Sequence, residues 1–238
     1  MKRTHHSRRA GFTLVELLTV IIIIGFLAAM VAGVAPAVMR SVKQSAIRAE
    51  IQQLSMALEA YKAEYGEYPP DGTNSTSVTN HIRRCYPDAN STNIYATVTP
   101  KNALYIFLGP HNADPRNPFT QSPKNSTSTT KALFEFDESR LNLSTYEFMP
   151  SGCTLPYYYL KAVGATGRKQ YNTTSYAAYK DENGSWYNPE SYQIVSAGLD
   201  DDLGVATGTI VVEEGSINTA TGDNIVNFGK KLVKDLLD

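Results

Sequence analysis

Three consecutive carboxylates are the most prominent chemical feature of the chain. Asp200, Asp201 and Asp202 lie in a glycine-flanked turn directly after a predicted strand, and a second oxygen-rich pair, Asp223 and Asn224, follows later in the chain. Adjacent carboxylates repel one another unless they are solvated or neutralised, and calcium takes about six to eight such oxygen ligands in flexible loops. The spacing does not match an EF-hand loop. From the residues alone, a calcium site and an exposed acidic turn both remain open.

A single charge interrupts the longest apolar stretch. The run from Phe12 to Met39 has Glu16 as its only charged residue, and 23 uncharged residues begin at Leu17. A carboxylate near the start of a bilayer span is costly and usually has a functional partner. Cleavage after Gly11 would supply one, because the new amino group of Phe12 would be positively charged. The alternative is a glutamate that sits at headgroup depth.

The cysteines and histidines give no support for catalysis. Cys85 and Cys153 lack C-x-x-C spacing and a nearby histidine pair, which excludes a cysteine-based zinc site. In an oxidising compartment these two cysteines can form one disulfide, and two free thiols are the alternative. His81 and His111 fall in segments predicted as polar loops, where a lone histidine is usually solvated. Since no zinc-peptidase, P-loop or dinucleotide-binding motif occurs, the sequence predicts no enzyme.

The composition narrows the class of protein further. The 238 residues carry a formal net charge of -1, which excludes a nucleic-acid binder with a broadly basic surface. The length is enough for one medium domain plus an extra element. The 15 tyrosines and 1 tryptophan give a surface-like aromatic profile.

The amino-terminal segment has the pattern of a membrane anchor. Residues 1–11 form a short basic leader, and residues 12–39 are long and apolar enough to cross a bilayer as a helix. Basic residues before a span hold that side in the cytoplasm, so we expect the chain after Arg40 on the far side of the membrane. A secretory signal peptide would have a shorter apolar region and an A-x-A cleavage site.

Residues 40–68 continue this span as an amphipathic helix. Apolar residues recur at alternating spacings of four and three: Ile47, Ile51, Leu54, Leu58, Tyr61 and Tyr65. This pattern is one face of a helix that must be covered by another element. Gly66 and the Pro69-Pro70 pair then stop the helix. The sequence therefore predicts one helix from Phe12 to about Tyr65.

The remainder divides into a polar insertion and a β-rich head. Residues 69–150 are predicted to be a polar variable insertion, and residues 151–238 a β-sheet with a calcium-type loop and a terminal amphipathic helix. Segments rich in Ser, Thr and Asn are predicted as solvated loops at 73–80, 90–99 and 120–131. A short helix is predicted at 103–108, and strands at 133–136, 155–162 and 192–196.

The junction between the leader and the span resembles a known processing signal. Arg8-Arg9-Ala10-Gly11 followed by Phe12-Thr13-Leu14-Val15-Glu16 is similar to the cleavage signal of type IV pilins and type II secretion pseudopilins. The resemblance implies that a prepilin peptidase cuts between Gly11 and Phe12 and methylates the new amino terminus. It also implies an assembly role for Glu16, paired with the amino terminus of a neighbouring subunit. Two charges that are unfavourable singly in lipid are tolerable as a pair.

A second resemblance, to the major pseudopilin of type II secretion, covers the run from Ala57 to Pro69 and the carboxyl-terminal region. That family ends its long helix with a similar leucine and tyrosine face, then glycine, an aromatic residue and proline. It also has a calcium loop with a Ser-x-Gly-x-Asp turn after a strand, and then an Asp-rich turn before Ile-x-Asn-aromatic. The matching positions are Ser196, Gly198 and Asp200, and then Asp223, Asn224, Ile225, Asn227 and Phe228.

This second resemblance implies a calcium ion as cofactor and a set of candidate ligands. These are the Asp200 carboxylate, the Ala197 carbonyl, Asp202, Asp223 and Asn224. Asn224 stands where relatives often have an aspartate, which implies a less charged and weaker site.

Together these observations predict an α+β protein with a type IV pilin-like fold. A long amino-terminal helix, membrane-spanning in its first half, packs on a small antiparallel β-sheet with loop insertions. The implied function is a structural subunit of a type II secretion pseudopilus, held in the bacterial inner membrane with its head in the periplasm. The expected partners are the prepilin peptidase, copies of the chain, other pseudopilins and an inner-membrane assembly platform with a separate ATPase, but no nucleic acid.

Three other functions remain open at this point. A type IV or competence pilin and a minor pseudopilin share the amino-terminal pattern. A membrane-tethered protein that binds carbohydrate or peptide through a Tyr-rich head belongs to a different class.

Overall fold

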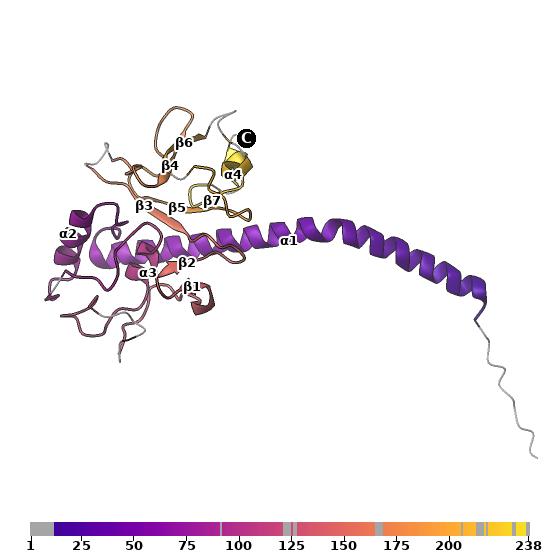
Figure 1. Ribbon diagram of the computed structural model, residues 1–238, viewed down its shortest axis with the longest axis horizontal. Coiled ribbons are helices and arrows are strands. Elements are labelled where there is room, and N and C mark those ends of the chain that lie inside the picture. Colours follow the sequence, from indigo (N-terminus) through magenta and orange to yellow (C-terminus); the bar gives the residue numbers. More distant parts are fainter. Residues whose placement is uncertain are drawn as a thin grey trace, which may run out of the picture. The chain divides into compact units, whose positions relative to one another are not determined.

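The computed structural model describes residues 12–90, 92–120, 125, 128–164, 169–205, 207–212, 217, 219–229 and 232–236. The chain divides into two units, Met1–Val42 and Lys43–Asp238. Helix α1, Leu14–Tyr65, contributes to both units (Figure 1). The leader, residues 1–11, including Gly11, lies outside the described residues.

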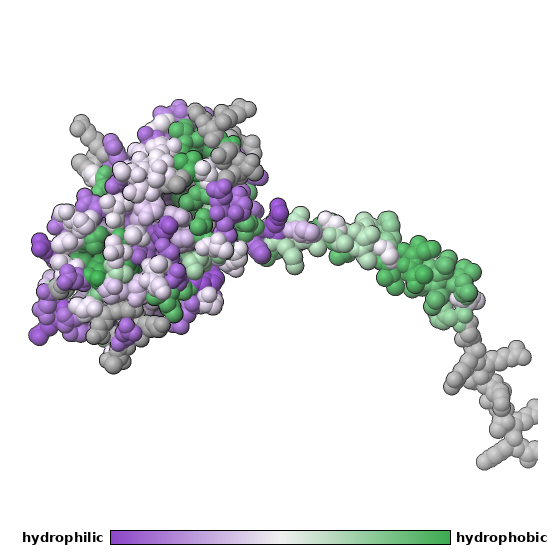
Figure 2. Space-filling model, in the orientation of Figure 1, coloured by the Kyte–Doolittle hydropathy of each residue, from purple (hydrophilic) through white to green (hydrophobic). Residues whose placement is uncertain are grey.

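In the first unit α1 is exposed on every side. Every residue from Phe12 to Val42 is exposed, and Figure 2 shows the hydrophobic surface that this part of the helix presents. A helix that is hydrophobic all round needs an apolar environment. Among the described residues, α1 is the one helix long and apolar enough to cross a membrane. Pro36 lies inside α1 without ending it.

The second half of α1 contributes a buried apolar stripe to the hydrophobic core of the second unit. The predicted stripe is buried at Ile47, Ile51, Leu54, Leu58 and Tyr61. As predicted, the helix ends at Gly66, whose φ of 82° suits the left-handed position after a helix and whose N–H donates to Lys62 O at 2.8 Å.

An antiparallel sheet packs on this stripe. Its strands are β3 (Tyr158–Lys161), β5 (Tyr192–Ser196) and β7 (Ile225–Val226), with β5 in the centre. Tyr157, Tyr159 and Ile194 share one hydrophobic cluster with the α1 stripe. The strands predicted at 155–162 and 192–196 are therefore confirmed, and the predicted α+β arrangement with them.

The described residues form two further pairs of strands. Strands β1 (Leu141–Asn142) and β2 (Glu147–Phe148) form a short antiparallel pair after the 3-10 helix η2 (Glu138–Arg140). Strands β4 (Ala177–Asp181) and β6 (Gly208–Val212) pair in parallel, which the prediction of an antiparallel sheet did not include. Arg140 also donates two hydrogen bonds to the Glu50 carboxylate, at 2.9 and 2.5 Å, and so fastens η2 to α1.

The carboxyl-terminal region differs from the predicted amphipathic helix. The described residues form helix α4 (Thr219–Gly222) and the 3-10 helix η3 (Val233–Leu236). Leu232 and Val233 are buried, but Leu232 is held in an isolated antiparallel bridge with Ile225. Because a bridge needs extended backbone, this pairing interrupts the expected helix. Leu237 lies outside the described residues.

The insertion contributes more to the core than predicted. Segment 73–80 is largely helix α2 (Ser75–Cys85), which begins at Asn74, whose Oδ1 accepts from the N–H groups of Thr76 and Ser77 at 2.9 and 3.2 Å. Polar residues there act as a helix cap, and Val78 supplies a buried contact. Val98 is buried within segment 90–99. The prediction of a solvated loop is therefore wrong for segment 73–80. The described residues of segment 90–99 form no helix or strand, as predicted, although Val98 is buried, and segment 120–131 lies partly outside the described residues.

Two other predictions in this region have opposite outcomes. The predicted short helix is confirmed as α3 (Ala103–Leu108), all of which is buried. The predicted strand at 133–136 is wrong, because the segment forms no strand. Phe134 and Phe136 instead pack edge to face with each other and with Phe148.

The aromatic residues are mostly internal, which corrects the surface-like profile expected from composition. Nine of the 15 tyrosines are buried: Tyr61, Tyr68, Tyr105, Tyr157, Tyr158, Tyr159, Tyr171, Tyr179 and Tyr192. Several bury the ring while the hydroxyl finds a partner, as in the hydrogen bond from Tyr159 Oη to Pro69 O at 2.7 Å.

Both histidines that were predicted to be solvated are also buried. His81 lies on α2 and is 1 % exposed, and His111 is 8 % exposed. His111 Nε2–H donates to Ile106 O at 2.9 Å, and its ring contacts Tyr86 and Phe119. The loop composition concealed this burial because the covering aromatic residues come from distant segments.

The burial of His111 predicts a pH dependence of stability. Burial lowers the pKa of His111 to about 4, whereas an unfolded histidine titrates near about 6.5. As the pH falls from about 6.5 to about 4, the unfolded state binds more protons, so stability is lost in that window. His111→Gln keeps a donor for Ile106 O and does not titrate. We expect wild type to lose on the order of 3 kcal/mol more than this variant between pH 7 and pH 4, measured by denaturant unfolding. Parallel pH profiles for the two proteins would contradict the assignment.

Candidate functional site

The amino terminus of α1 is closed by a reciprocal pair of side chains. Glu16 Oε2 accepts hydrogen bonds from Thr13 N–H and from the Thr13 hydroxyl, both at 2.8 Å. The Glu16 N–H donates in return to Thr13 Oγ1 at 3.3 Å. This arrangement is a capping box, which satisfies helix donors that have no intrahelical partner. The role of Thr13 was not predicted from the sequence, although the Thr13-x-x-Glu16 spacing signals it.

The cap also fixes where the Glu16 charge lies. Phe12, which would carry the amino group after cleavage, directly precedes Thr13 and is 80 % exposed. The positive end of the helix dipole lies in the same first turn and favours a carboxylate there. The geometry therefore places a fixed negative charge at the exposed amino-terminal end of an apolar helix.

The pairing of strands β5 and β7 brings the two acidic turns together. Ser196 at the end of β5 is in register with Ile225 at the start of β7. The turn after β5 therefore lies beside the turn before β7. Gly198 has a φ of 76°, and a Cβ placed on it would lie 2.5 Å from Asp223 O and 2.8 Å from Asp223 Oδ2. The close approach of the two turns thus depends on glycine at this position.

Two carboxylates face each other across this contact. Burial, and after it the negative charge of Asp200, raise the pKa of Asp223 to about 6. A like charge nearby disfavours the ionised form in the same direction as desolvation. Neutralisation by a cation would relieve both effects.

Two buried oxygens of the consecutive residues Asp223 and Asn224 lack hydrogen-bond partners. Within the described part of the chain, the buried atoms Asp223 Oδ1 and Asn224 Oδ1 have none. The Asn224 amide group is otherwise held, since its Nδ2 donates to Tyr179 Oη at 2.7 Å and to Leu203 O at 3.3 Å. An unpaired buried polar atom costs about 1–3 kcal/mol. Carboxylate and amide oxygens are the donors that calcium takes, so these residues fit that ion.

The remaining acidic residues of the first turn have structural roles. Asp201 Oδ1 accepts from the N–H groups of Thr154 and Leu155, at 2.7 and 3.1 Å, and so fastens the turn to a distant loop. Asp202 Oδ1 accepts from Gly204 N–H at 2.8 Å. From the predicted ligand set the structure therefore brings together Asp200 and Asp223, with Asn224 next to Asp223 in the chain, and it gives Asp202 a bond within its own turn. Ala197, the predicted carbonyl ligand, is buried beside Gly198.

The sequence analysis did not single out Asp201. Nothing in a run of three aspartates distinguishes the middle one, and its partners are about 46 residues away in the chain. Only the tertiary fold identifies it.

Both cysteines are free, so the possible disulfide between Cys85 and Cys153 is not formed. The two thiols face different parts of the head. Cys153 Sγ–H donates to Gly198 O at 3.0 Å in the acidic turn, whereas Cys85 Sγ–H faces Tyr65 O at 3.6 Å near the end of α1.

Comparison with known proteins identifies the amino-terminal motif. Residues 6–32 match the model of the prokaryotic N-terminal methylation motif. No curated protein and no solved structure matches the chain. Among the described residues, the small sheets follow one helix that is long and apolar enough to cross a membrane, in a pilin-like α+β arrangement. The matched motif is typical of type IV pilin-like proteins, which are generally structural and non-enzymatic, and it implies processing by a prepilin peptidase.

Two glycines with the same backbone angle provide a test of the acidic turn. Gly198 and Gly184 both have a φ of 76°, but only Gly198 contacts another segment. Gly184→Ala should cost about 1–2 kcal/mol from the left-handed backbone alone. Gly198→Ala should cost at least about 1 kcal/mol more, because its Cβ meets Asp223. The measurement is denaturant unfolding of the full chain in detergent micelles. Equal losses in the two variants would show that the turns do not touch as described.

Proposed function

We propose that the chain is a structural subunit of a type II secretion pseudopilus. It would be anchored in the bacterial inner membrane, with its head in the periplasm. The observation that carries the proposal is the first half of α1, which is exposed from Phe12 to Met39, has Glu16 as its only charge there, and bears the methylation motif at its start. Such a helix needs lipid before assembly and the helices of neighbouring subunits afterwards.

Glu16 supplies the polar link between subunits in this proposal. Removal of residues 1–11 by the prepilin peptidase would leave an N-methylated amino group on Phe12. An ionised carboxylate offers about four acceptor sites. The capping box uses Glu16 Oε2 for two bonds from Thr13, which leaves acceptor capacity for the amino group of a neighbouring subunit. The pair would keep both charges compensated in the apolar filament core.

The filament would act mechanically. Copies of the chain and other pseudopilins would stack through their apolar helices on an inner-membrane platform, and the growing filament would push folded proteins towards an outer-membrane channel. The sequence contains no nucleotide-binding motif, so a separate ATPase would drive assembly.

A calcium ion bound at the acidic turns would favour the major pseudopilin over the other pilin-like classes. It would bind the Asp200 and Asp223 carboxylates and Asn224 Oδ1, with the Ala197 carbonyl and Asp202 as further candidates. The ion would offset the repulsion between the two carboxylates and occupy the oxygens that lack partners. Bound there, it would hold together the turns at the β5 and β7 ends.

The alternative of a binding protein with a Tyr-rich surface gains no support from the fold. Nine of the 15 tyrosines are buried in the head. Their number reflects the core of the head, and it does not indicate an exposed aromatic platform.

Calcium should stabilise the folded head. At about 2 mM calcium and a dissociation constant near about 0.1 mM, binding adds roughly 1.8 kcal/mol. For a chain of this size that is a rise in melting temperature of about 4–7 °C. The rise should disappear in Asp200→Asn and in Asp223→Asn, measured on the full chain in detergent micelles with calcium and then with chelator.

The measurement with chelator tests the repulsion between Asp200 and Asp223. Without calcium, Asp223→Asn should melt no lower than wild type, because the substitution removes the repulsion with Asp200. Asp88→Asn, at an exposed aspartate elsewhere, is the control and should keep the calcium response. If wild type shows no response, the calcium assignment and the preference for the major pseudopilin fail, and the pilin-like class remains.

Substitution of Glu16 separates its charge from its role as a cap. Glu16→Gln retains a side-chain acceptor for Thr13 N–H and loses the negative charge, whereas Thr13→Ala weakens the cap and leaves the charge in place. We expect Glu16→Gln to insert into the membrane normally and to lose filament assembly and protein secretion, while Thr13→Ala still assembles. The readouts are subunit cross-linking in the membrane and the secreted fraction of a cargo protein. Normal assembly of Glu16→Gln would rule out the charge-pairing mechanism.

A further inference from the structure

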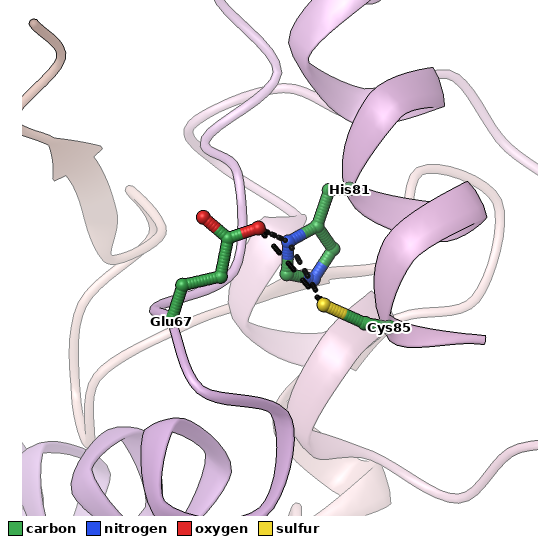
Figure 3. A group of neighbouring side chains, drawn as sticks. All are labelled: Glu67, His81 and Cys85. Carbon is green, nitrogen blue, oxygen red and sulfur yellow. Dashed lines mark hydrogen bonds and ion pairs between the residues drawn. The ribbon is translucent and has the colours of Figure 1, made fainter. Parts of the chain in front are cut away.

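Three side chains with metal-binding groups meet where α1 ends. Glu67 follows the glycine that terminates α1, and His81 and Cys85 lie one turn apart on the same face of α2. His81 Nδ1 is 2.7 Å from Glu67 Oε1, and Cys85 Sγ is 3.7 Å from His81 Nδ1 and 3.9 Å from Glu67 Oε1. Figure 3 shows the three groups pointing toward one another.

The triangle formed by these atoms is close to one face of a tetrahedral zinc site. Zinc lies about 2.3 Å from a thiolate sulfur and about 2.0–2.1 Å from nitrogen or oxygen, so the edges of that face are about 3.5 Å to sulfur and about 3.3 Å between nitrogen and oxygen. The two edges to sulfur are nearly in place. Only the edge between His81 Nδ1 and Glu67 Oε1 must widen, by about 0.6 Å, as an ion replaces their hydrogen bond.

We propose that Glu67, His81 and Cys85 bind Zn²⁺ or a similar transition-metal ion, which ties the segment after α1 to α2. The Cys85 thiol would lose its proton to the solvent as its sulfur binds the ion. A thiolate with an imidazole and a carboxylate favours such an ion over calcium or magnesium, which take oxygen ligands. The site is therefore chemically distinct from the acidic turns.

The surroundings of His81 suit a metal ligand. His81 Nε2 lies 2.7 Å from Tyr61 Oη, and Tyr61 Oη lies 3.2 Å from Tyr86 Oη. When the metal takes Nδ1, the ring carries its hydrogen on Nε2 and donates it to Tyr61 Oη. The Tyr61 hydroxyl can then rotate towards Tyr86. A second hydrogen bond of this kind orients most metal-binding histidines.

Two cationic side chains beside Glu67 would affect how tightly the site binds a metal ion. Lys161 Nζ lies 3.3 Å from Glu67 Oε2 and holds that oxygen, and Arg84 pairs with Oε1, the oxygen that the metal would use. The Arg84 side chain is 67 % exposed, so it can turn into the solvent when the ion binds. Because its charge repels a cation, Arg84 weakens the site in the proposed arrangement.

The cluster is accessible from the surface. Cys85 lines a hollow of about 280 Å³, and Glu67 lines another of about 350 Å³ together with Arg84 and Lys161. An ion can therefore enter, and a water molecule can take the fourth ligand position. The prediction that no cysteine-based zinc site occurs rested on cysteine and histidine spacing, which does not reveal Glu67 because this third ligand comes from the separate segment after α1.

The test is metal titration of the full chain in detergent micelles, with a phosphine reductant and with saturating calcium to fill the acidic turns. Zn²⁺ binding is followed by calorimetry, and Co²⁺ binding by the thiolate-to-cobalt charge-transfer absorption. We expect one Zn²⁺ per chain. Cys85→Ser should weaken binding at least about 10-fold and remove the absorption band. Cys153→Ser, the matched control at the other thiol, should change neither.

Arg84→Gln should have the opposite effect on Zn²⁺ affinity from Cys85→Ser. The position is exposed, so this substitution is not expected to disturb folding. It should tighten Zn²⁺ binding several-fold. The proposal is overturned if wild type binds no stoichiometric Zn²⁺, if Cys85→Ser binds as tightly as wild type, or if Cys153→Ser removes the cobalt absorption. The calcium site is tested separately, by the melting temperatures of Asp200→Asn and Asp223→Asn. A negative result for zinc therefore leaves the proposed function standing, and a negative result for calcium leaves the zinc site standing.

Discussion

Helix α1 must satisfy two environments with one continuous backbone, and the rest of the molecule follows from that requirement. From Phe12 to Met39 its side chains are exposed and, apart from Glu16, uncharged and mostly apolar, which is stable only in lipid or against other apolar helices. From Ile47 to Tyr61 only one stripe is apolar, and the head covers it. The carboxyl-terminal half of α1 is thus covered by the second unit, whereas its beginning is exposed among the described residues.

Packing on that stripe also positions both candidate sites in the head. The sheet that lies on α1 pairs β5 with β7, and this pairing places Asp200 beside Asp223. At the end of the same helix, the turn after Gly66 places Glu67 against α2. Both sites join segments that are distant in sequence, so an ion at either one would reinforce contacts that the hydrophobic core has already made.

The polar groups that hold the head together are also directed at α1. Glu50 on α1 accepts two hydrogen bonds from Arg140 and one from Tyr157 Oη at 2.6 Å. These bonds join the helix to the insertion and to the sheet at one carboxylate. A half-buried charge of this kind is stable because both of its oxygens are paired. The insertion is consequently a structural part of the head, although its composition suggested solvated loops.

Features that depend on local spacing could be predicted from the residues alone. They include the apolar span, the 3-4 stripe, the end of α1 before Gly66, helix α3 and strands β3 and β5, which follow from periodicity and from backbone preferences of single residues. Features that depend on distant partners became visible in the folded chain. The burial of His81 and His111, the different roles of the three consecutive aspartates, and the meeting of Glu67 with Cys85 require segments brought together by the core. Local composition carries no signal of these contacts, because burial depends on which segments pack together and not on the polarity of neighbouring residues.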